Sequence, residues 1–505
     1  MNSVFIIAVI LFYLVSMIVI GYLNSRGNRS AGDLYLGGRR LGPIVTAMST
    51  EASDMSAYLL MGVPGLALFC GVAEASWTAI GLALGTWLNW LLVARRRRRY
   101  SARVGAITVP DFLALRFRDS SKIIETLGAL LVVIFFVPYT ASAFVACGTL
   151  FSSMFGWDYL PTMLVSAAVI VAYCAMGGFN AASITSLIQS LVMTFALAVV
   201  FFFGVNAAGG WAAVMANARA VPGYLSLFAS TDITSSAAGR FGAIDIVSTL
   251  AWGLGYFGMP HVLIHFMAAK REEQLAVSRR IATVWVVVSL GAAVVIGLVG
   301  YGMVRAGAIE GFSSSSEAES VLVRAAALMG RKNVFFALIA GLILAGILSA
   351  TMSTADVQLL AAASGITHNL LTDVFGLKLS EKKQLLIARL GVIAIAVIAV
   401  FFALDPASSV FRVVSFAWAG FGATFGPAML FSLFWKRCSR SGIIAGMLTG
   451  GVTIFLWKYL VRPLGGAWNI YELLPAFLLS CLAIVLFSLL GAAPEPEIVE
   501  EFESV

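Results

Sequence analysis

Long apolar runs recur along the whole chain and set its predicted architecture. Runs of 18 to 25 residues are long enough for a helix to cross a hydrocarbon core of about 30 Å. About thirteen spans are predicted, at residues 4–23, 43–69, 72–93, 121–153, 160–178, 185–205, 242–267, 281–304, 333–371, 386–403, 409–435, 441–460 and 470–491. The connections between them are short. The pattern therefore predicts an all-α integral membrane protein with no soluble domain.

Composition agrees with this reading. Of the 505 residues 60% are hydrophobic and only 11% are charged, whereas a soluble domain carries about 25% charged residues. The 48 glycines suit helices that pack closely or unwind locally inside a membrane. The five cysteines stand singly in or beside apolar segments without CxxC spacing, so neither a disulfide framework nor a metal framework is predicted.

Basic residues gather on one side of the predicted topology. With thirteen spans, alternate connections lie on the same side of the membrane. The odd-numbered connections, which include the run Arg95 to Arg99, hold 24 of the 33 lysines and arginines, and the other side holds 9. The positive-inside rule then places the N-terminus outside and the C-terminus in the cytoplasm of a cell-membrane protein. The net charge of +8 is thus a topology signal and predicts no nucleic-acid partner. The arginine run is interpreted as a topology anchor in preference to a lipid-headgroup site.

The first run, residues 4–23, spans a full bilayer and lacks both a basic leader and a small-residue cleavage site. We interpret it as a retained helix and not as a signal peptide. Together with the linker that follows, it forms a predicted segment 1–30 that stands before the repeated part of the chain.

Two spans are unusual for helices that face lipid. Span two carries Glu51, Asp54 and five hydroxyls between residues 46 and 56, and span seven carries three glycines and a proline between residues 252 and 261. Interrupted segments at corresponding places in two halves are typical of inverted-repeat transporters with a midplane site. The predicted repeats are residues 43–205 (helices 2–6) and 242–435 (helices 7–11), followed by helices 12–13 at 441–491 and an acidic cytoplasmic tail at 492–505.

Span nine adds a candidate cation site. Ser353 and Thr354 are adjacent hydroxyls, and Ala350 lies one turn earlier. A carbonyl oxygen beside two hydroxyls makes a hard-oxygen site of the kind that suits Na⁺. The signal is weak alone, because serine and threonine often bond to their own helix.

Several segments together resemble the solute:sodium symporter family, and within it the bacterial sodium/proline symporters. The matching segments run in order from about residue 5 to 490. They are Leu36-Gly-Gly-Arg39 with Leu41-Gly-Pro43, Ala52-Ser-Asp-Met-Ser56 with Leu59-Leu-Met-Gly62, Trp252-Gly-Leu-Gly-Tyr-Phe-Gly258 with Pro260-His261, Met352-Ser-Thr354, and Ala417-Trp-Ala-Gly-Phe-Gly422 with Phe425-Gly-Pro427. As a set they are highly specific.

The resemblance implies a fold of broken helices in two inverted repeats, with Na⁺ as the coupling ion. It implies a sodium site made by the carbonyls of Ala52, Met55 and Ala350 and the hydroxyls of Ser353 and Thr354. It also implies that Asp54 is critical for ion coupling and that Arg39 belongs to the cytoplasmic gating region. For the substrate it implies Tyr139, Trp252, Tyr256, Pro260 and His261, whose rings could enclose a pyrrolidine while polar tips and backbone bind its carboxylate and amine.

The chain also departs from the family pattern. Relatives often have Trp-Thr-Asp at the start of span six, where this chain has Ile184-Thr-Ser186, and usually have serine where this chain has Asp356. Our hypothesis is that carboxylate and hydroxyl have exchanged helices, which leaves an anionic site between Ser186, Ser353 and Asp356. The alternative is that Asp356 faces cytoplasmic water.

Three other departures bear on the coupling ion and the substrate. Glu51 stands where proline symporters tend to have a small or amide residue, His265 where they tend to have arginine, and Met259 where they have glutamine. Glu51 and Asp356 could titrate, so proton coupling stays open. Met259 leaves room for a related substrate.

The resulting prediction is a sodium-coupled symporter that imports L-proline by alternating access, with another small amino acid or organic acid as the alternative substrate. A membrane enzyme is disfavoured, since no catalytic constellation is evident. The short tail disfavours a sensor, and an aromatic pocket between broken helices suits a transporter better than a channel. His261 and His265 lack a third ligand nearby, so no transition-metal site is predicted. No obligate protein partner is evident.

Overall fold

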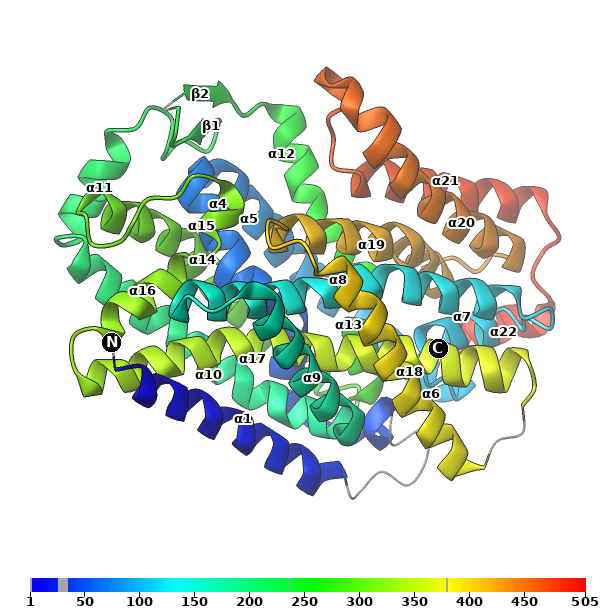
Figure 1. The fold of residues 1–505 in the computed structure, drawn as a ribbon. Coiled ribbons are helices and arrows are strands. Elements are labelled where there is room, and N and C mark those ends of the chain that lie inside the picture. Colours follow the sequence, from blue (N-terminus) through cyan, green and yellow to red (C-terminus); the bar gives the residue numbers. More distant parts are fainter. Residues whose placement is uncertain (1, 26–34, 236, 378–379) are drawn as a thin grey trace.

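The computed structural model describes residues 2–25, 35–235, 237–377 and 380–505, and they are helical almost throughout (Figure 1). The linker at the end of the predicted 1–30 segment lies outside the described residues, as do Arg26, Arg29 and Lys378 of the basic residues counted above. One small addition to the prediction is an antiparallel hairpin of β1 (Ala229–Asp232) and β2 (Ala237–Arg240). The all-α membrane architecture is otherwise confirmed.

Each predicted span corresponds to helical structure. Within the described residues, eleven helical stretches are long and apolar enough to cross a membrane. They are α1 (Ser3–Ser25), α3 with η2 and α4 (Pro43–Ala57, Tyr58–Gly62, Val63–Cys70), α5 with η3 and α6 (Val72–Leu88, Asn89–Val93, Ala94–Val104), α8 (Ile123–Phe155), α10 (Phe179–Ala207), α14 (Leu275–Arg305), α17 with η5 (Val334–Ser364, Gly365–Val374), α18 (Glu381–Phe402), α19 (Val410–Phe434), α20 with η6 and η7 (Arg440–Leu456, Trp457–Val461, Arg462–Leu464) and α21 (Leu473–Leu490). The other two are the shorter α9 (Tyr159–Gly177) and the broken set α12, η4 and α13 (Ala243–Leu250, Ala251–Phe257, Pro260–Ala268).

The connections form short elements at the two ends of the bundle. Figure 1 shows α11 (Trp211–Arg219), the hairpin, α15 (Ser315–Ala318) and α16 (Val321–Gly330) at one end, and α6, α7 (Val109–Arg116) and α22 (Pro496–Glu503) at the other. Two further 3₁₀ turns, η1 (Gly37–Arg39) and η8 (Gly466–Trp468), complete the fold. The prediction that the third span stops at residue 93 is wrong as a helix boundary, because α6 continues through the arginine run to Val104.

Both predicted breaks are present. The first lies at Ser56, in the last turn of α3, where φ of 49° and ψ of −166° are far from helical values. The second lies at Met259, which is extended, with Pro260 in the first turn of α13. Proline is tolerated there because its missing N–H has no intrahelical acceptor. Each break leaves backbone groups free of helical bonding in the interior of the bundle.

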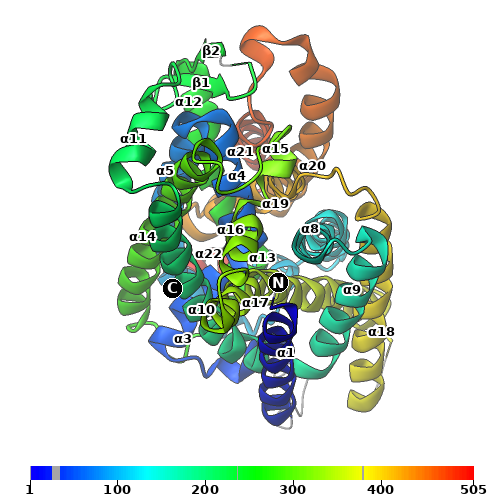
Figure 2. The same ribbon diagram turned by 60° about the vertical axis from the view of Figure 1, so that its left-hand side comes forward.

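α17 is the central helix of the molecule. Every residue from 343 to 364 is buried, and α17 packs on α1, α3, α8 and α10. Figure 2 shows α17 surrounded by α1, α8, α9 and α10. Polar residues on this helix therefore face other helices, and Ser353, Thr354 and Asp356 are at most 1% exposed.

A close backbone contact fixes η4 against α5. A Cβ on Gly85 would lie 2.3 Å from the backbone oxygen of Gly253, and a Cβ on Gly253 would lie 2.3 Å from that of Gly81. Real Cβ atoms do not approach backbone that closely. Asn89 adds a hydrogen bond of 3.0 Å from its amide to the Tyr256 carbonyl. The glycines therefore allow α5 to hold the segment that carries Trp252 and Tyr256.

Gly85→Ala is expected to destabilise the protein by about 3 kcal/mol, because the added methyl group forces two backbones apart. The measurement is thermal unfolding of the purified protein in detergent. Gly291→Ala is the matched control, because nothing lies within 4 Å of a Cβ at this helical glycine, and alanine favours helix by about 1 kcal/mol. Equal unfolding temperatures for the two variants would contradict the close contact.

Candidate functional site

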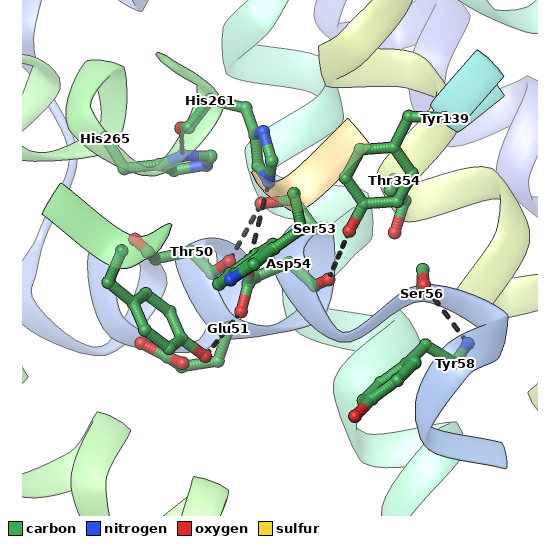
Figure 3. A network of polar contacts seen from close by, with 12 residues as sticks. Thr50, Glu51, Ser53, Asp54, Ser56, Tyr58, Tyr139, His261, His265 and Thr354 are labelled. Carbon is green, nitrogen blue, oxygen red and sulfur yellow. Dashed lines mark hydrogen bonds and ion pairs between the residues drawn. The ribbon is translucent and has the colours of Figure 1, made fainter. Parts of the chain in front are cut away.

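The end of α3 brings acidic and hydroxyl side chains into the interior. All residues from Thr46 to Ala57 are buried, including Glu51 and Asp54. The helix is polar on several faces because it packs against α10, α13, α14 and α17 and not against lipid. Figure 3 shows Asp54 close to the point where the helix breaks, with His261 and Tyr139 directed toward it.

Three residues assigned to the substrate converge on Asp54. The Tyr256 hydroxyl donates to the carboxyl oxygen Oδ2 at 2.6 Å, and His261 Nε2 lies 3.6 Å from Oδ1. The Tyr139 hydroxyl donates to the Asp54 backbone oxygen at 3.1 Å (Figure 3). These side chains come from η4, α13 and α8. Segments from both predicted repeats therefore meet at one residue beside the first break.

Trp252 lies apart from this group, in an aromatic cluster that the sequence does not predict. Its ring centroid is 5.2 Å from Tyr471, 5.3 Å from Tyr58 and 5.4 Å from Phe411. Trp418 donates to the Trp252 carbonyl at 2.7 Å and packs edge-on against Tyr256 at 5.0 Å. Trp418 was not assigned to the site from the sequence, although it belongs to the motif Ala417 to Gly422, which could have indicated its role.

Pro260 and Met259 form the second break. Pro260 occupies the first turn of α13 and is buried, as is Met259. The N-terminus of α13 therefore points its free backbone N–H groups into the interior, where they favour an anionic group. All five residues assigned to the substrate are buried, so the structure encloses this region.

The residues assigned to sodium lie where α17 meets α3. Ser353 donates to the Ala52 carbonyl at 2.8 Å and approaches the Ala350 carbonyl at 3.2 Å. Thr354 donates to the Ala350 carbonyl at 3.1 Å. The Met55 carbonyl accepts from the backbone N–H of Tyr58 across the break. Every ligand atom here is an uncharged oxygen, which is the donor type that unwound transporter helices offer to Na⁺.

Asp356 of α17 hydrogen-bonds a residue other than its expected partners, Ser186 and Ser353. Its Oδ1 accepts from the Cys174 thiol at 3.1 Å, and the side chain is buried. The alternative that Asp356 faces cytoplasmic water is therefore wrong for this conformation. Among the residues that the structure describes, neither Ser186 nor Ser353 hydrogen-bonds Asp356, and both Asp356 Oδ2 and Ser186 Oγ are buried without a hydrogen-bond partner.

Arg39 joins three segments at the end of the bundle that carries α6. Its guanidinium donates to the Met267 carbonyl at 2.8 Å, to the Ala106 carbonyl at 2.8 Å and to the Ser101 carbonyl at 3.0 Å. The preceding Gly37 and Gly38, like Arg39 itself, have φ near 60°, a region that glycine adopts readily. Burial and the neighbouring Arg98 lower the pKa of Arg39 to about 10, so it stays charged at neutral pH.

Arg39→Lys is expected to reduce the initial rate of substrate uptake about tenfold. A lysine ammonium cannot reproduce the guanidinium fork, and the loss of hydrogen bonds to a charged group costs about 1.5–3 kcal/mol each. The α13 end would then separate from α6 more easily. Arg40→Lys, at an exposed neighbouring position, is the control and should transport like the wild type. Equal rates for both variants would remove Arg39 from the gating region.

The remaining residues singled out by sequence have separate partners. Glu51 is fully buried, and one of its oxygens accepts from the Trp90 indole at 2.9 Å. His265 contacts the His261 carbonyl through Nδ1 at 2.6 Å. Among the described residues, the one group of three potential metal-ligating side chains is Asp111, Glu125 and Asp373, and it contains neither histidine.

Comparisons with known proteins agree with the motifs. A family model described as "Sodium:solute symporter family" matches residues 34–450. A sodium/proline symporter of Haemophilus influenzae is 40% identical over 97% of this chain and 95% of its own length. One of Escherichia coli is 38% identical over 97% and 94%, and an osmoregulated proline transporter of Bacillus subtilis is 38% identical over 95% and 94%.

Solved structures show the same fold at low sequence identity. A Na⁺-coupled sialic acid symporter in a substrate-bound, outward-open state has a TM-score of 0.78 at 15% identity, covering 97% of this chain and 99% of its own. A nucleobase-cation-symport-1 family transporter has a TM-score of 0.55 at 16% identity, covering 95% and 99%. The predicted broken-helix transporter fold is thereby confirmed.

Proposed function

We propose, on the premise that this chain belongs to the sodium:solute symporter family, that it imports L-proline together with Na⁺ by alternating access. The observation that carries the proposal is the convergence of Tyr139, Tyr256 and His261 on Asp54, next to the contact between Ser353 and Ala52. The family membership and the proline transport of the relatives named above support it. The protein is a transporter and not an enzyme.

The proposed sodium site explains how ion binding could favour one conformation. The carbonyls of Ala52 and Met55 belong to α3, whereas Ala350, Ser353 and Thr354 belong to α17. A cation shared by these oxygens would replace the present hydrogen bond between Ser353 and Ala52 and hold the two helices together. Because a ligand shifts a conformational equilibrium by its differential affinity for the two states, such a bridge couples sodium binding to closure around the substrate.

The proposed substrate site follows the charge pattern around the second break. The carboxylate of proline would lie toward the N-terminus of α13 at Pro260, where backbone N–H groups are free. Its amine would face the oxygen atoms gathered at Asp54. The rings of Tyr139, Tyr256 and His261 would enclose the pyrrolidine, and Trp252 would act with Trp418 as the wall behind Tyr256.

The test is uptake of labelled proline into vesicles that hold the purified protein, with an imposed sodium gradient or an imposed pH gradient. Saturable uptake with sodium alone is expected. Uptake driven by pH alone would replace sodium by protons as the coupling ion. Failure of proline to be carried or to compete would leave another small amino acid or organic acid as the substrate.

The proposed orientation, with the N-terminus outside and the end with α6, α7 and α22 in the cytoplasm, can be measured by cysteine labelling in the same vesicles.

A second cation site is proposed between α17 and α10, around Asp356 and Ser186. The support is the buried, unpartnered Asp356 Oδ2 and Ser186 Oγ on helices that pack together. Asp356→Ser is expected to raise the sodium concentration for half-maximal uptake about tenfold, because one carboxylate ligand is lost and a charged partner contributes about 1.5–3 kcal/mol. Sodium dependence of uptake is the measurement. Unchanged sodium affinity and unchanged coupling in this variant would remove the second site.

A further inference from the structure

The C-terminal helix α22 is docked on the same end of the bundle as α6 and α7 (Figure 1). Its apolar side chains Ile498 and Phe502 are each only 7% exposed. The Phe502 ring lies beneath two guanidinium groups, 4.6 Å from that of Arg96 and 5.1 Å from that of Arg116. Cation–π contacts of this kind are attractive, and more so where water is excluded. The helix is therefore seated by specific contacts and is not a free acidic tail.

Ion pairs surround this apolar seat. Glu497 pairs with Arg118 after α7, and Glu503 pairs with Lys436 at 3.1 Å after α19. Arg99 of α6 donates to the backbone oxygen of Val505 at 2.6 Å. α6 and α7 belong to the first repeat and its loop, whereas α19 is the last helix of the second repeat. α22 therefore links the loop of the first repeat to Lys436, the residue that directly follows the second repeat, across one face of the molecule.

α6 also contacts the C-terminal end of α13. Arg97 contacts the Met267 sulfur at 3.0 Å, and Arg98 donates to the Ala269 carbonyl at 2.6 Å. Arg99, which holds Val505, also donates to Glu272 at 2.8 Å. α6 thus connects α22 directly to the end of α13. A displacement of α13 relative to α19 would strain or break the contacts of α22.

Docking of α22 also has a cost that would permit its release. Arg116 is 1% exposed, and both of its terminal nitrogens lack a hydrogen-bond partner among the described residues. Phe502 lies over it. The Arg116 Nε donates to the Ser432 carbonyl at 3.3 Å, but the two terminal nitrogens lose hydration that no hydrogen bond replaces. Undocking of α22 would return Arg116 to water, which offsets part of the lost contact between α22 and the bundle.

We propose that α22 is a latch that holds the two repeats together on this face and must release before this face can open. The proposal rests on the proposed alternating-access function, because the rocking of one repeat against the other is what opens and closes such a site. α22 docked as seen here stabilises the conformation closed on this side. Its release is then part of each transport cycle.

The decisive experiment locks the latch. Two cysteine pairs are combined in one chain, Arg118→Cys with Glu497→Cys and Lys436→Cys with Glu503→Cys, so that α22 is joined at both of its ion-pair sites by a short bis-methanethiosulfonate cross-linker, which a reductant cleaves. Proline uptake into vesicles is expected to fall at least about tenfold on cross-linking and to recover on reduction, since a locked state cannot exchange. Each single-cysteine variant, treated in the same way, is the control for modification of native cysteines. Full uptake by the cross-linked protein would overturn the latch.

Point variants of α22 test the same idea without cross-linking. Glu497→Gln removes a paired carboxylate, and Glu500→Gln removes an exposed one on the same helix for which no ion pair is found among the described residues. The first should raise the KM for external proline about twofold to fivefold with little change in maximal rate, because it populates the state open on the face that carries α22, to which external proline has no access. The second should leave both unchanged. Equal effects of the two variants would show that α22 acts only through its overall charge and would contradict the latch.

Failure of the proposed function is distinguishable from failure of the latch. If the wild type carries no proline, that result counts against the substrate assignment. The yield of the cross-link, measured with and without sodium, still reports on release, and a yield that differs between the two conditions is expected. A constant yield in both conditions would overturn the latch.

Discussion

Asp54→Asn is expected to reduce sodium-driven proline uptake by at least about 100-fold, because several parts of the proposed site depend on this one carboxyl group. Tyr256 donates to one of its oxygens at 2.6 Å, and His261 lies 3.6 Å from the other. Asparagine has the same shape but keeps only one acceptor oxygen. Either Tyr256 or His261 then faces an amide nitrogen, inside a region where water cannot compensate.

The variant is measured by initial uptake rates at saturating sodium and by proline binding to the purified protein. Tyr256→Phe is the informative companion, because it removes the donor and keeps the ring. It should weaken proline binding about tenfold, the effect of one lost hydrogen bond to a charged group, and leave sodium affinity close to the wild type. Uptake by Asp54→Asn within threefold of the wild type would remove Asp54 from the coupling mechanism.

Ser353→Ala is expected to raise the sodium concentration for half-maximal uptake at least about tenfold, the loss of one ligand worth about 1.4 kcal/mol or more. Ser353 is the side chain that already bridges α17 to the Ala52 carbonyl of α3, at 2.8 Å. Alanine removes the hydroxyl and leaves the helix intact. Proline affinity at saturating sodium should change much less, because the hydrogen bonds found for this hydroxyl among the described residues go to the carbonyls of Ala52 and Ala350, and neither residue is assigned to the substrate.

The matched control for Ser353 is Ser364→Ala. Ser364 is buried on the same helix, and its hydroxyl donates to the carbonyl of Ala361, at 2.7 Å, in its own helix. Its removal should leave sodium dependence unchanged. A similar rise in both variants would mean that α17 is sensitive to any lost hydroxyl, and the assignment of Ser353 to the ion would fail.

The overall fold was predictable because its signals are local. Apolar runs of membrane length and the polar, glycine-rich interruptions near residues 54 and 256 are visible in any window of twenty residues. The course of α6 was not predictable in the same way. Five consecutive arginines are typical of an exposed loop, yet Arg97 is fully buried against Phe112 at 3.6 Å. That outcome depends on partners more than ten residues away in the sequence.

The candidate site was predictable only in part. Tyr139, Tyr256 and His261 were assigned through the family resemblance, and periodicity alone would have given ordinary packing for each. The sequence could not show that Trp252 packs in an aromatic cluster apart from Asp54, because its neighbours Tyr58, Phe411 and Tyr471 come from three distant segments. The Asp356 partner was equally hidden, since Cys174 lies 182 positions earlier. Nothing in the apolar sequence around Cys174 indicates that its thiol faces a carboxyl group.

The aromatic cluster also gives the protein a built-in optical reporter. Trp252 and Trp418 are 4% and 2% exposed, with ring centroids 6.3 Å apart. An indole shielded from water emits at shorter wavelength than a hydrated one, and two indoles this close share their electronic excitation. Any motion that admits water between α19 and η4 shifts this emission toward the red. We expect opening of the enclosed region to shift the part of the native fluorescence that this pair contributes among the eleven tryptophans.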